Sequence, residues 1–207
     1  MTLFTMLPRA LLAAAVLGLG ACSATFKTDY PAPVSRDATA SWRLKDVQVV
    51  VPAALTVSEQ ASVFPTADIV WREDKGMDRK AQIAKIIDDA ATAGAQGLSG
   101  SRPVILRLTV ARFHALTFEA EALKYQGVGV HNIIFTAEVI DAATGAVLTG
   151  PTTIDAQIPG YTGAEAVAKR KAGITQKVLI SSEVKRVIAG WLNLGPDPRN
   201  EFTRIGG

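Results

Sequence analysis

Two stretches of the chain alternate apolar and polar residues, and this pattern limits the possible folds more than any other feature. Residues 104–110 place apolar side chains at every second position, and so do residues 133–139. Such alternation is typical of strands that have one face in a core. The turn sequence 141–145 ends in Gly145 and favours a hairpin into a third strand from Val147 towards Ile158. We therefore expect an antiparallel sheet.

Two further strands are predicted earlier in the chain. Within 42–51 the apolar residues change face between Leu44 and Val47, so this strand either starts near Asp46 or carries a bulge. A short apolar piece, 67–71, predicts a second strand.

Two segments have helical periodicity. The first begins after Asp78, an N-cap residue, and ends at Gly94; its buried stripe comprises Ile83, Ile86, Ile87 and Ala90. The second opens with Thr162 and Glu165, a T-x-x-E capping box, and its apolar face predicts one long helix to Trp191. Together the patterns predict an α+β fold, a mostly antiparallel sheet with two helices packed on one face.

Composition limits the class of protein. The chain has 207 residues, one cysteine, 22 basic and 19 acidic residues. This length suits one core-bearing domain. The lone cysteine excludes an intramolecular disulfide framework and a cysteine-rich zinc site. The nearly balanced charge does not favour nucleic acid as a partner.

The first residues have the outline of a signal peptide. Residues 1–9 contain one base, Arg9, and no acid, and residues 10–21 have no polar side chain. That apolar stretch is shorter than the roughly 20 residues that span a bilayer as a helix. We therefore expect residues 1–21 to be an export signal.

The end of this stretch, Leu19-Gly20-Ala21-Cys22, resembles the lipobox of bacterial lipoproteins. The resemblance implies cleavage before Cys22, a diacylglycerol thioether on Cys22 and usually a further acyl chain, such as palmitate, on the new amino terminus. Ser23 follows rather than Asp, which in many Gram-negative lipoproteins goes with export to the outer membrane. The alternative is an ordinary signal peptide cut after Ala24, which would give a soluble periplasmic protein.

The remaining sequence divides into three parts. Residues 22–41, the lipidated cysteine and a stretch rich in small, polar and proline residues, predict a flexible tether. Residues 42–195 form the single α+β domain. Residues 196–207 follow Gly195 and predict a loose tail.

Two histidines are the candidate metal ligands. A hairpin centred on 117–129 would place His114 and His131 opposite each other, with Glu119 and Glu121 in the connection. Imidazole and carboxylate suit zinc. The alternative is that each histidine closes the end of a strand through hydrogen bonds, and a shift of one residue in register would separate the pair.

Two glycine motifs fail as catalytic or phosphate-binding signatures. The segment 127–129 lacks the third glycine and the following helix of a phosphate loop. In 97–100 the second glycine comes directly after Ser99, which does not fit a nucleophile elbow. Residues 127–129 are interpreted as a flexible strand entry or bulge and residues 97–100 as a loop. We predict no catalytic residue and no cofactor.

Charged side chains gather in two places. The segment 68–79 sets Trp71 beside acids and bases, and it is either a recognition loop or a turn whose tryptophan fills the core, which we favour. Basic residues on the last helix either face anionic headgroups or an acidic partner, or form a solvated surface; they are Lys169, Arg170, Lys171, Lys177, Lys185 and Arg186.

Several short pieces resemble a family of uncharacterised bacterial lipoproteins of unknown function. The resemblance runs from about residue 42 to 155 and includes 42–44, 51–52, 55–59, 67–72, 112–117 and 129–131. It implies an envelope lipoprotein and no established activity. The hairpin at 141–145 is more loosely similar to small α+β lipoproteins that assist envelope assembly or transport machines, at the level of fold alone.

These observations predict a membrane-anchored envelope lipoprotein that faces the periplasm. We expect a non-enzymatic binding or assembly module with an envelope protein as partner, bound through a sheet edge or the loop from Trp71 to Arg79. The alternatives are a metal-binding protein or enzyme that uses His114 and His131, and a carrier of an apolar ligand held between sheet and helices.

Overall fold

The computed structural model describes residues 23–205, so the predicted signal peptide and Cys22 lie outside the described residues. The elements in chain order are β1 (Ser23–Thr28), α1 (Arg36–Ala40), β2 (Trp42–Val50), β3 (Ile69–Val70), α2 (Arg79–Gly94), β4 (Arg102–His114), α3 (Phe118–Glu121), β5 (Val130–Asp141), β6 (Val147–Pro159), α4 (Gly163–Lys171), α5 (Gln176–Trp191) and β7 (Asn200–Ile205). No helix in this range has the length and apolar character to cross a membrane.

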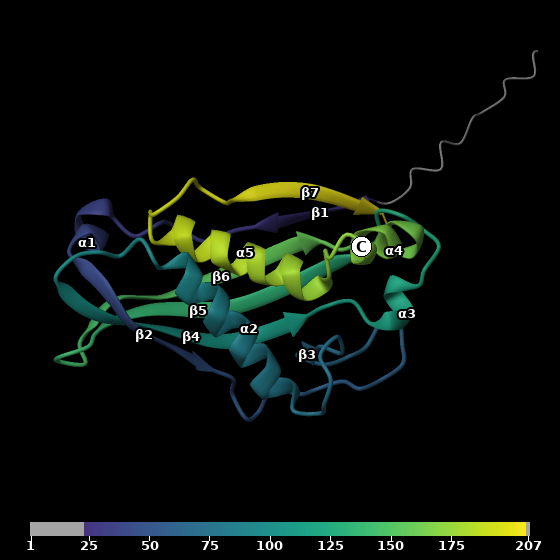
Figure 1. Ribbon diagram of the computed structural model, residues 1–207, viewed down its shortest axis with the longest axis horizontal. Helices are drawn as coiled ribbons and strands as arrows, with labels where there is room; N and C mark the ends of the chain where they lie inside the picture. The colour runs from purple at the N-terminus through teal and green to yellow at the C-terminus, as the bar shows by residue number, and fades with distance from the viewer. Residues whose placement is uncertain (1–22, 206–207) are drawn as a thin grey trace, which may run out of the picture.

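A five-stranded sheet forms the centre of the molecule (Figure 1). Its order is β2-β4-β5-β6, and the short β3 also pairs with β4. The pairs β4–β5 and β5–β6 are antiparallel, whereas β2 and β3 run parallel to β4. The register of β2 against β4 shifts between Leu44 and Asp46, so the predicted change of face is a bulge.

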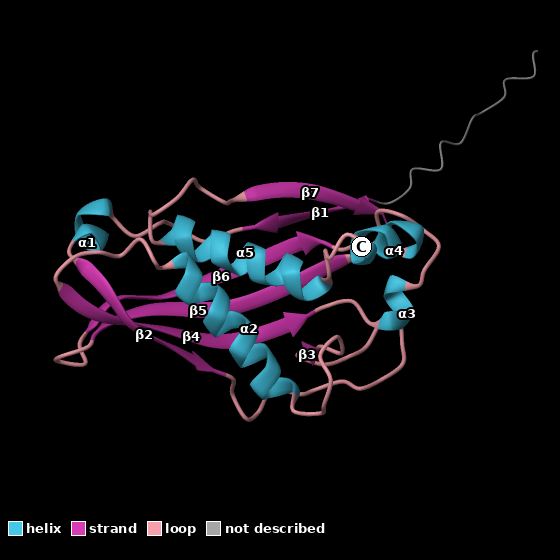
Figure 2. Ribbon diagram, in the orientation of Figure 1, coloured by secondary structure: helices cyan, strands magenta, loops and turns pink. Residues whose placement is uncertain are grey.

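The two long helices, α2 and α5, cover one face of this sheet (Figure 2). The alternating residues of β4 and β5 point towards them and are buried, as are Ile83 of α2 and Val184 of α5. Asp78 caps α2 by accepting a hydrogen bond from the Ala81 amide at 3.0 Å. A Cβ at Gly94 would lie 2.5 Å from the Lys185 carbonyl oxygen, so this glycine lets the helices approach closely. The predicted α+β architecture with two helices on one face is confirmed.

The predicted single C-terminal helix is in fact two helices. Between α4 and α5 the chain turns at Gly173, whose φ of +78° ends the first helix. Thr175 then caps α5 by accepting a hydrogen bond from the Val178 amide at 3.3 Å. The expected capping box at Thr162 does not form, because the Thr162 hydroxyl donates to the Tyr125 carbonyl instead.

The predicted tether and tail also require correction. Over all six of their residues, β1 and β7 pair as an antiparallel ribbon, and Phe26 stacks on Phe202 with ring centroids 5.7 Å apart. Tyr30 and Val34, which follow β1, are buried in the core. Residues 23–41 and 200–205 are therefore ordered parts of the fold, because apolar side chains spaced between small and polar residues find partners in each other and in the domain.

Candidate functional site

An apolar pocket lies at one end of the five-stranded sheet, next to Ile205, the last residue of the separate strand β7. It has a volume of about 460 Å³, within the range typical of small-molecule sites. None of the described side chains that line it is charged. Its principal apolar walls are Val63, Phe64, Leu116, Leu123, Tyr125 and Ile205.

The short helix α3 ties one wall of the pocket together. Thr117, which is buried, caps this helix by accepting a hydrogen bond from the Ala120 amide at 3.0 Å. The same hydroxyl donates to the Ser62 carbonyl oxygen at 2.7 Å. One side chain therefore fixes the segment that carries Val63 and Phe64 against α3.

The start of α4 holds a second wall. Gly163 has a φ of +59°, and a Cβ there would lie 2.8 Å from the Leu123 carbonyl oxygen. The left-handed conformation and this close approach both require glycine. With the hydrogen bond from Thr162 to the Tyr125 carbonyl, this contact fixes residues 123–125 on α4.

Gly129 and Gly160 lie at the floor of the apolar pocket and leave room for Leu116. A Cβ at Gly129 would lie 2.8 Å from Leu116 Cδ1, and one at Gly160 would lie 2.9 Å from the same atom. The Gly160 amide also donates to the Gly129 carbonyl oxygen at 2.9 Å. The Leu116 side chain therefore occupies the space that side chains at 129 and 160 would otherwise need. The glycine pair at 127 and 129, predicted to be a flexible entry to a strand, has this packing role at Gly129.

The ribbon of β1 and β7 closes the pocket and brings the first described residue to it. The Ile205 amide donates to the Gly127 carbonyl oxygen at 2.9 Å, and Arg204 Nε donates to the Gly129 carbonyl oxygen at 3.2 Å. Ser23 is the partner of Ile205 in the ribbon. Cys22, the predicted lipid-bearing residue, lies outside the described residues but is bonded to Ser23.

The mouth of the pocket exposes apolar side chains to solvent. The exposed fractions are 82% for Phe64, 73% for Tyr125 and 52% for Ile205. Single exposed apolar residues are common, but a group of them around one pocket marks an interaction site. We refer to Phe64, Tyr125 and Ile205 as the apolar rim.

A polar cluster lies between α3, β5 and the two C-terminal helices. Arg170 donates to both Glu121 oxygens and, at 2.5 Å, to Glu73, while Gln176 Nε2 donates to Glu121 at 2.6 Å. Burial raises the pKa of Glu121, but the hydrogen bonds from Arg170 and Gln176 outweigh burial and hold the pKa below its usual value. His131 lines the same small pocket and is fully buried, and burial lowers its pKa to about 4. Its imidazole is therefore neutral at pH 7.

The two histidines do not form the expected pair. Val110 pairs with Phe135, and a regular continuation of that register would set His114 opposite His131. A bulge between Val110 and Arg112 adds one residue, so His114 pairs with Asn132 instead. This shift turns His114 to the sheet face opposite His131, where Arg112 Nη2 lies 3.1 Å from its Nδ1 and its Nε2 contacts the Ala67 carbonyl. Within residues 23–205, no group of three or more His, Cys, Asp or Glu side chains could hold a metal ion.

The charged segment after β3 is built into the fold. Trp71 is fully buried and meets Phe113 edge to face at 5.7 Å, which confirms that it fills the core. Four of its acidic and basic neighbours form ion pairs with other parts of the chain. These pairs are Arg72–Glu119, Glu73–Arg170, Asp74–Lys177 and Arg79–Glu59.

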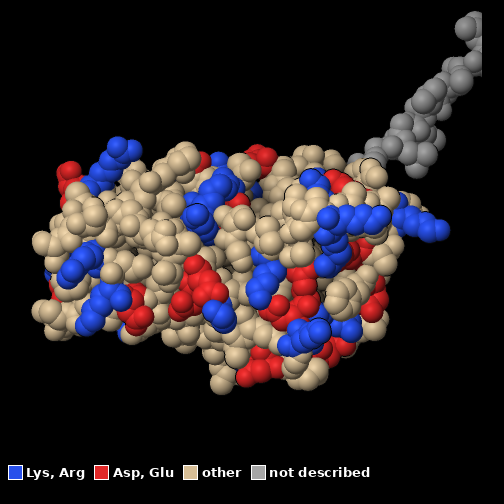
Figure 3. Space-filling view, viewed as in Figure 1, with Lys and Arg blue, Asp and Glu red and all other residues tan. Residues whose placement is uncertain are grey.

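Those pairs also account for part of the basic surface predicted on the last helix. Arg170 and Lys177 bind carboxylates of the segment after β3, and Arg186 binds Glu183 on its own helix at 2.7 Å. Figure 3 shows blue and red side chains interspersed over this face. The surface is therefore mixed in charge rather than a continuous basic patch.

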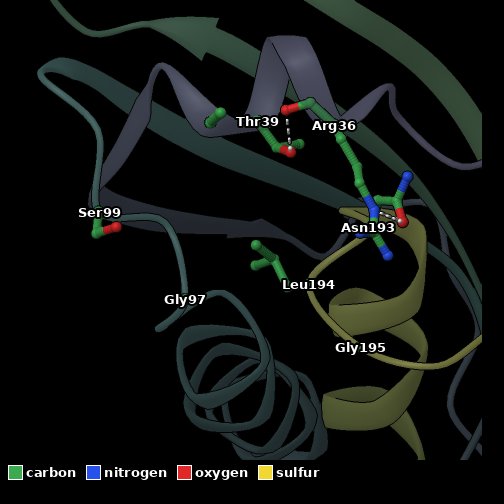
Figure 4. A pocket seen from close by; sticks show the side chains of 8 residues that line it. Arg36, Thr39, Gly97, Ser99, Asn193, Leu194 and Gly195 are labelled. Atoms are coloured by element: carbon green, nitrogen blue, oxygen red, sulfur yellow. Dashed lines mark hydrogen bonds between the residues drawn. The ribbon is translucent and has the colours of Figure 1, made fainter.

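A second hollow lies next to α1 (Figure 4). It has a volume of about 350 Å³ and is lined by residues of α1, the turn at 97–99 and the turn at 193–195. Arg36 Nε donates to Asn193 Oδ1 at 3.2 Å across it. Ser99 lines this hollow, and no histidine or carboxylate is among the described lining residues. The interpretation of 97–100 as a loop rather than a nucleophile elbow agrees with this position.

Sequence reasoning missed the apolar pocket because its walls come from segments interpreted as loop and tail. A partial signal was present in 23–28, where Ala24 and Phe26 alternate with polar residues, whereas the apolar residues of 200–205, Phe202 and Ile205, do not alternate. Phe64 and Tyr125 also stand as isolated aromatics in polar loops.

A model described as a family of unknown function (DUF6778) matches residues 42–207. No curated protein matches the chain. Among solved structures, the PelC dodecamer of Paraburkholderia phytofirmans is 13% identical with a TM-score of 0.34, over 80% of this chain and 96% of that one. The protein XCC0632 of Xanthomonas campestris, from the DUF330 family, is 11% identical with a TM-score of 0.42, over 78% and 87%. A candidate lipoprotein of Caulobacter crescentus CB15 is 16% identical with a TM-score of 0.33, over 77% and 96%. At these TM-scores the similarities carry no inference about function.

Proposed function

The chain belongs to the DUF6778 family of unknown function, and we propose that it is a lipid-anchored envelope protein whose domain is a non-enzymatic binding module at the membrane surface. The anchor is the lipid on Cys22, the membrane is the outer membrane, and the domain faces the periplasm. Two or more acyl chains give stable attachment, whereas one chain binds reversibly.

The observation that carries this proposal is the pairing of Ser23 with Ile205. It sets the residue next to Cys22 beside the apolar rim, so the anchor and the rim share one end of the molecule. Aromatic side chains favour the interface between headgroups and hydrocarbon. The exposed Lys124, between Leu123 and Tyr125, adds a cation suited to anionic headgroups. The domain would therefore rest on the membrane by this end.

The uncovered face of the sheet is the surface that we assign to a partner. Helices α2 and α5 cover the other face (Figure 2). Thr109, Thr136 and Thr153 pair across three strands on the uncovered face, and Arg107 forms an ion pair with Glu138 there. These side chains offer hydrogen bonds and charge to an envelope protein that docks across the strands.

The anchor is tested by the mass of the N-terminal peptide. Full-length protein from a Gram-negative host is expected to yield a peptide that begins at Cys22 and carries lipid. Cys22→Ala should lose the lipid and no longer reach the outer membrane, and Ser23→Asp should keep the lipid but move from the outer to the inner membrane. An unmodified Cys22 in membrane-derived protein would reject the anchor.

The partner is tested by crosslinking of tagged protein in intact cells followed by mass spectrometry. An envelope protein is expected with the parent and should be lost with Thr136→Arg, which places a bulky charge on the uncovered face. Val178→Arg, an exposed position on α5, is the matched control and should keep the partner. Equal capture by both variants would reject this face as the docking surface.

A second candidate function is the carriage of an apolar ligand, and the pocket favours it. The pocket lies at the end of the sheet, whereas the space between sheet and helices is filled by buried side chains. Organic extracts of the purified Cys22→Ala protein should contain a hydrophobic molecule at stoichiometric amount if this function holds. The alternative based on His114 and His131 gains no support, because the two rings occupy opposite faces of the sheet.

A further inference from the structure

The chemistry of the pocket fits a hydrocarbon chain. Its walls are apolar and its lining has no charged side chain among the described residues. The Thr162 hydroxyl, one of the few polar groups in the lining, is already used by the Tyr125 carbonyl. The pocket therefore gives an occupant apolar contact without a strong polar anchor, as an acyl chain requires.

The path of the chain identifies the source of such an acyl chain. Ser23 pairs with Ile205, and Ile205 lines the pocket. Cys22 is the next residue, and consecutive Cα atoms are about 3.8 Å apart. A lipid on Cys22 therefore starts within about one residue of a pocket wall.

We propose that one acyl chain of the lipid on Cys22 lies in the apolar pocket of the same molecule. The inference rests on the proposed function, because it requires lipid on Cys22. Covalent attachment gives this chain a high effective concentration at the pocket, which a free phospholipid does not have. The other chains of the lipid remain available to the bilayer, where two are enough for stable anchoring.

The pocket matters most when the protein is away from a bilayer. Inside a bilayer an acyl chain already has an apolar environment, so the pocket offers it little extra. In water the same chain is exposed, and burial against Leu116 and Leu123 removes it from solvent. A lipoprotein in transit between two membranes faces that condition.

Site-specific photocrosslinking tests the proposal. The photoreactive residue p-benzoylphenylalanine replaces Tyr125, an exposed aromatic, and in a second variant Leu123, deeper in the pocket. Full-length lipidated protein is purified, freed of detergent, irradiated in water without a bilayer and digested, and crosslinked peptides are identified by mass spectrometry. The expected product joins the pocket peptide to the lipid of the Cys22 peptide, and it should be lost with Cys22→Ala.

Val178 serves as the control position, because it is an exposed apolar residue of α5 outside the pocket. The same photoreactive residue there should give no crosslink to the Cys22 lipid. Since Tyr125 is exposed and is replaced by another aromatic, this variant should fold even if the Leu123 variant does not.

Each outcome separates the inference from the proposed function. A lipidated Cys22 with crosslinks to the Cys22 lipid from Tyr125 supports both. A lipidated Cys22 with crosslinks only to free phospholipid, or to no lipid, overturns the pocket assignment and leaves the anchor intact. A Cys22 without lipid overturns both.

Discussion

His131 lies beside Glu121 in a small buried pocket, yet neither of its ring nitrogens has a hydrogen-bond partner among the described residues. Burial lowers the pKa of His131 to about 4, while the Glu121 carboxylate opposes this shift to a smaller extent. The folded state therefore holds the neutral ring, whereas the unfolded state takes up a proton near pH 6.5.

This difference predicts a loss of stability in acid. Since the unfolded chain binds the proton first, the free energy of unfolding should fall as the pH decreases from about 6.5 and level off below about 4. A shift of this size corresponds to about 3 kcal/mol. Urea unfolding at pH 7 and pH 4.5 should show a smaller loss for His131→Leu than for the parent. His114→Gln is the comparison variant. Because His114 is less buried than His131, this variant should resemble the parent more closely than His131→Leu does. Equal pH dependence of the free energy of unfolding in all three proteins would contradict the assignment to His131.

The left-handed glycine at the start of α4 gives a second prediction. Gly163→Ala should lower stability more than Gly173→Ala, because both have positive φ but only position 163 lacks space for a Cβ. The conformational cost shared by both is roughly 1–2 kcal/mol. Thermal or urea unfolding of the two variants measures the difference, and a larger loss at position 173 would argue against the contact with Leu123.

The stacked pair in the terminal ribbon predicts local opening. Phe202→Ala removes the stack on Phe26, which contributes about 0.5–1.5 kcal/mol beyond the area that it buries. Amide hydrogen exchange in residues 23–28 should become faster, while exchange in β4 and β5 stays slow. Thr203→Ala, the exposed neighbour, should leave exchange in 23–28 unchanged. Similar acceleration by both variants would show that the stack does not hold the ribbon.

The apolar rim predicts weak membrane binding without the lipid. In protein expressed without residues 1–22, Phe64→Ser should reduce binding to vesicles that contain anionic lipid by at least about tenfold, since burial of a phenylalanine side chain contributes roughly 1.5–3 kcal/mol. Val178→Ser removes an exposed apolar residue away from the rim and should bind like its parent. Vesicle flotation measures the bound fraction, and equal binding by Phe64→Ser would exclude the rim as the contact.

Local sequence signals predicted the centre of the fold well. Three signals involve only residues close together in sequence and can therefore be recognised from the sequence alone. They are the alternation in β4 and β5, the turn at Gly145 and the helix cap at Asp78. The β1–β7 ribbon was missed because it joins segments far apart in the chain, and two segments of six residues with few apolar side chains do not reveal a distant partner.

The prediction of a histidine pair failed because the register of two paired strands cannot be inferred from residue spacing alone. His114 and His131 would be opposite in a regular hairpin, and one bulged residue near Ala111 separates them. A bulge depends on packing against the rest of the sheet, so spacing alone does not predict it. The pocket walls depend in the same way on contacts between loops far apart in sequence.

The pairing of the first described strand with the last has a consequence for biosynthesis. Chains are made from the amino terminus, and domains form as their parts become available. Residues 23–28 therefore have no strand partner until residues 200–205 have been synthesised and delivered to the same compartment. The strand at the anchored end would then become paired only after residues 200–205 arrive, and a chain truncated before them would leave residues 23–28 unpaired and accessible to proteases.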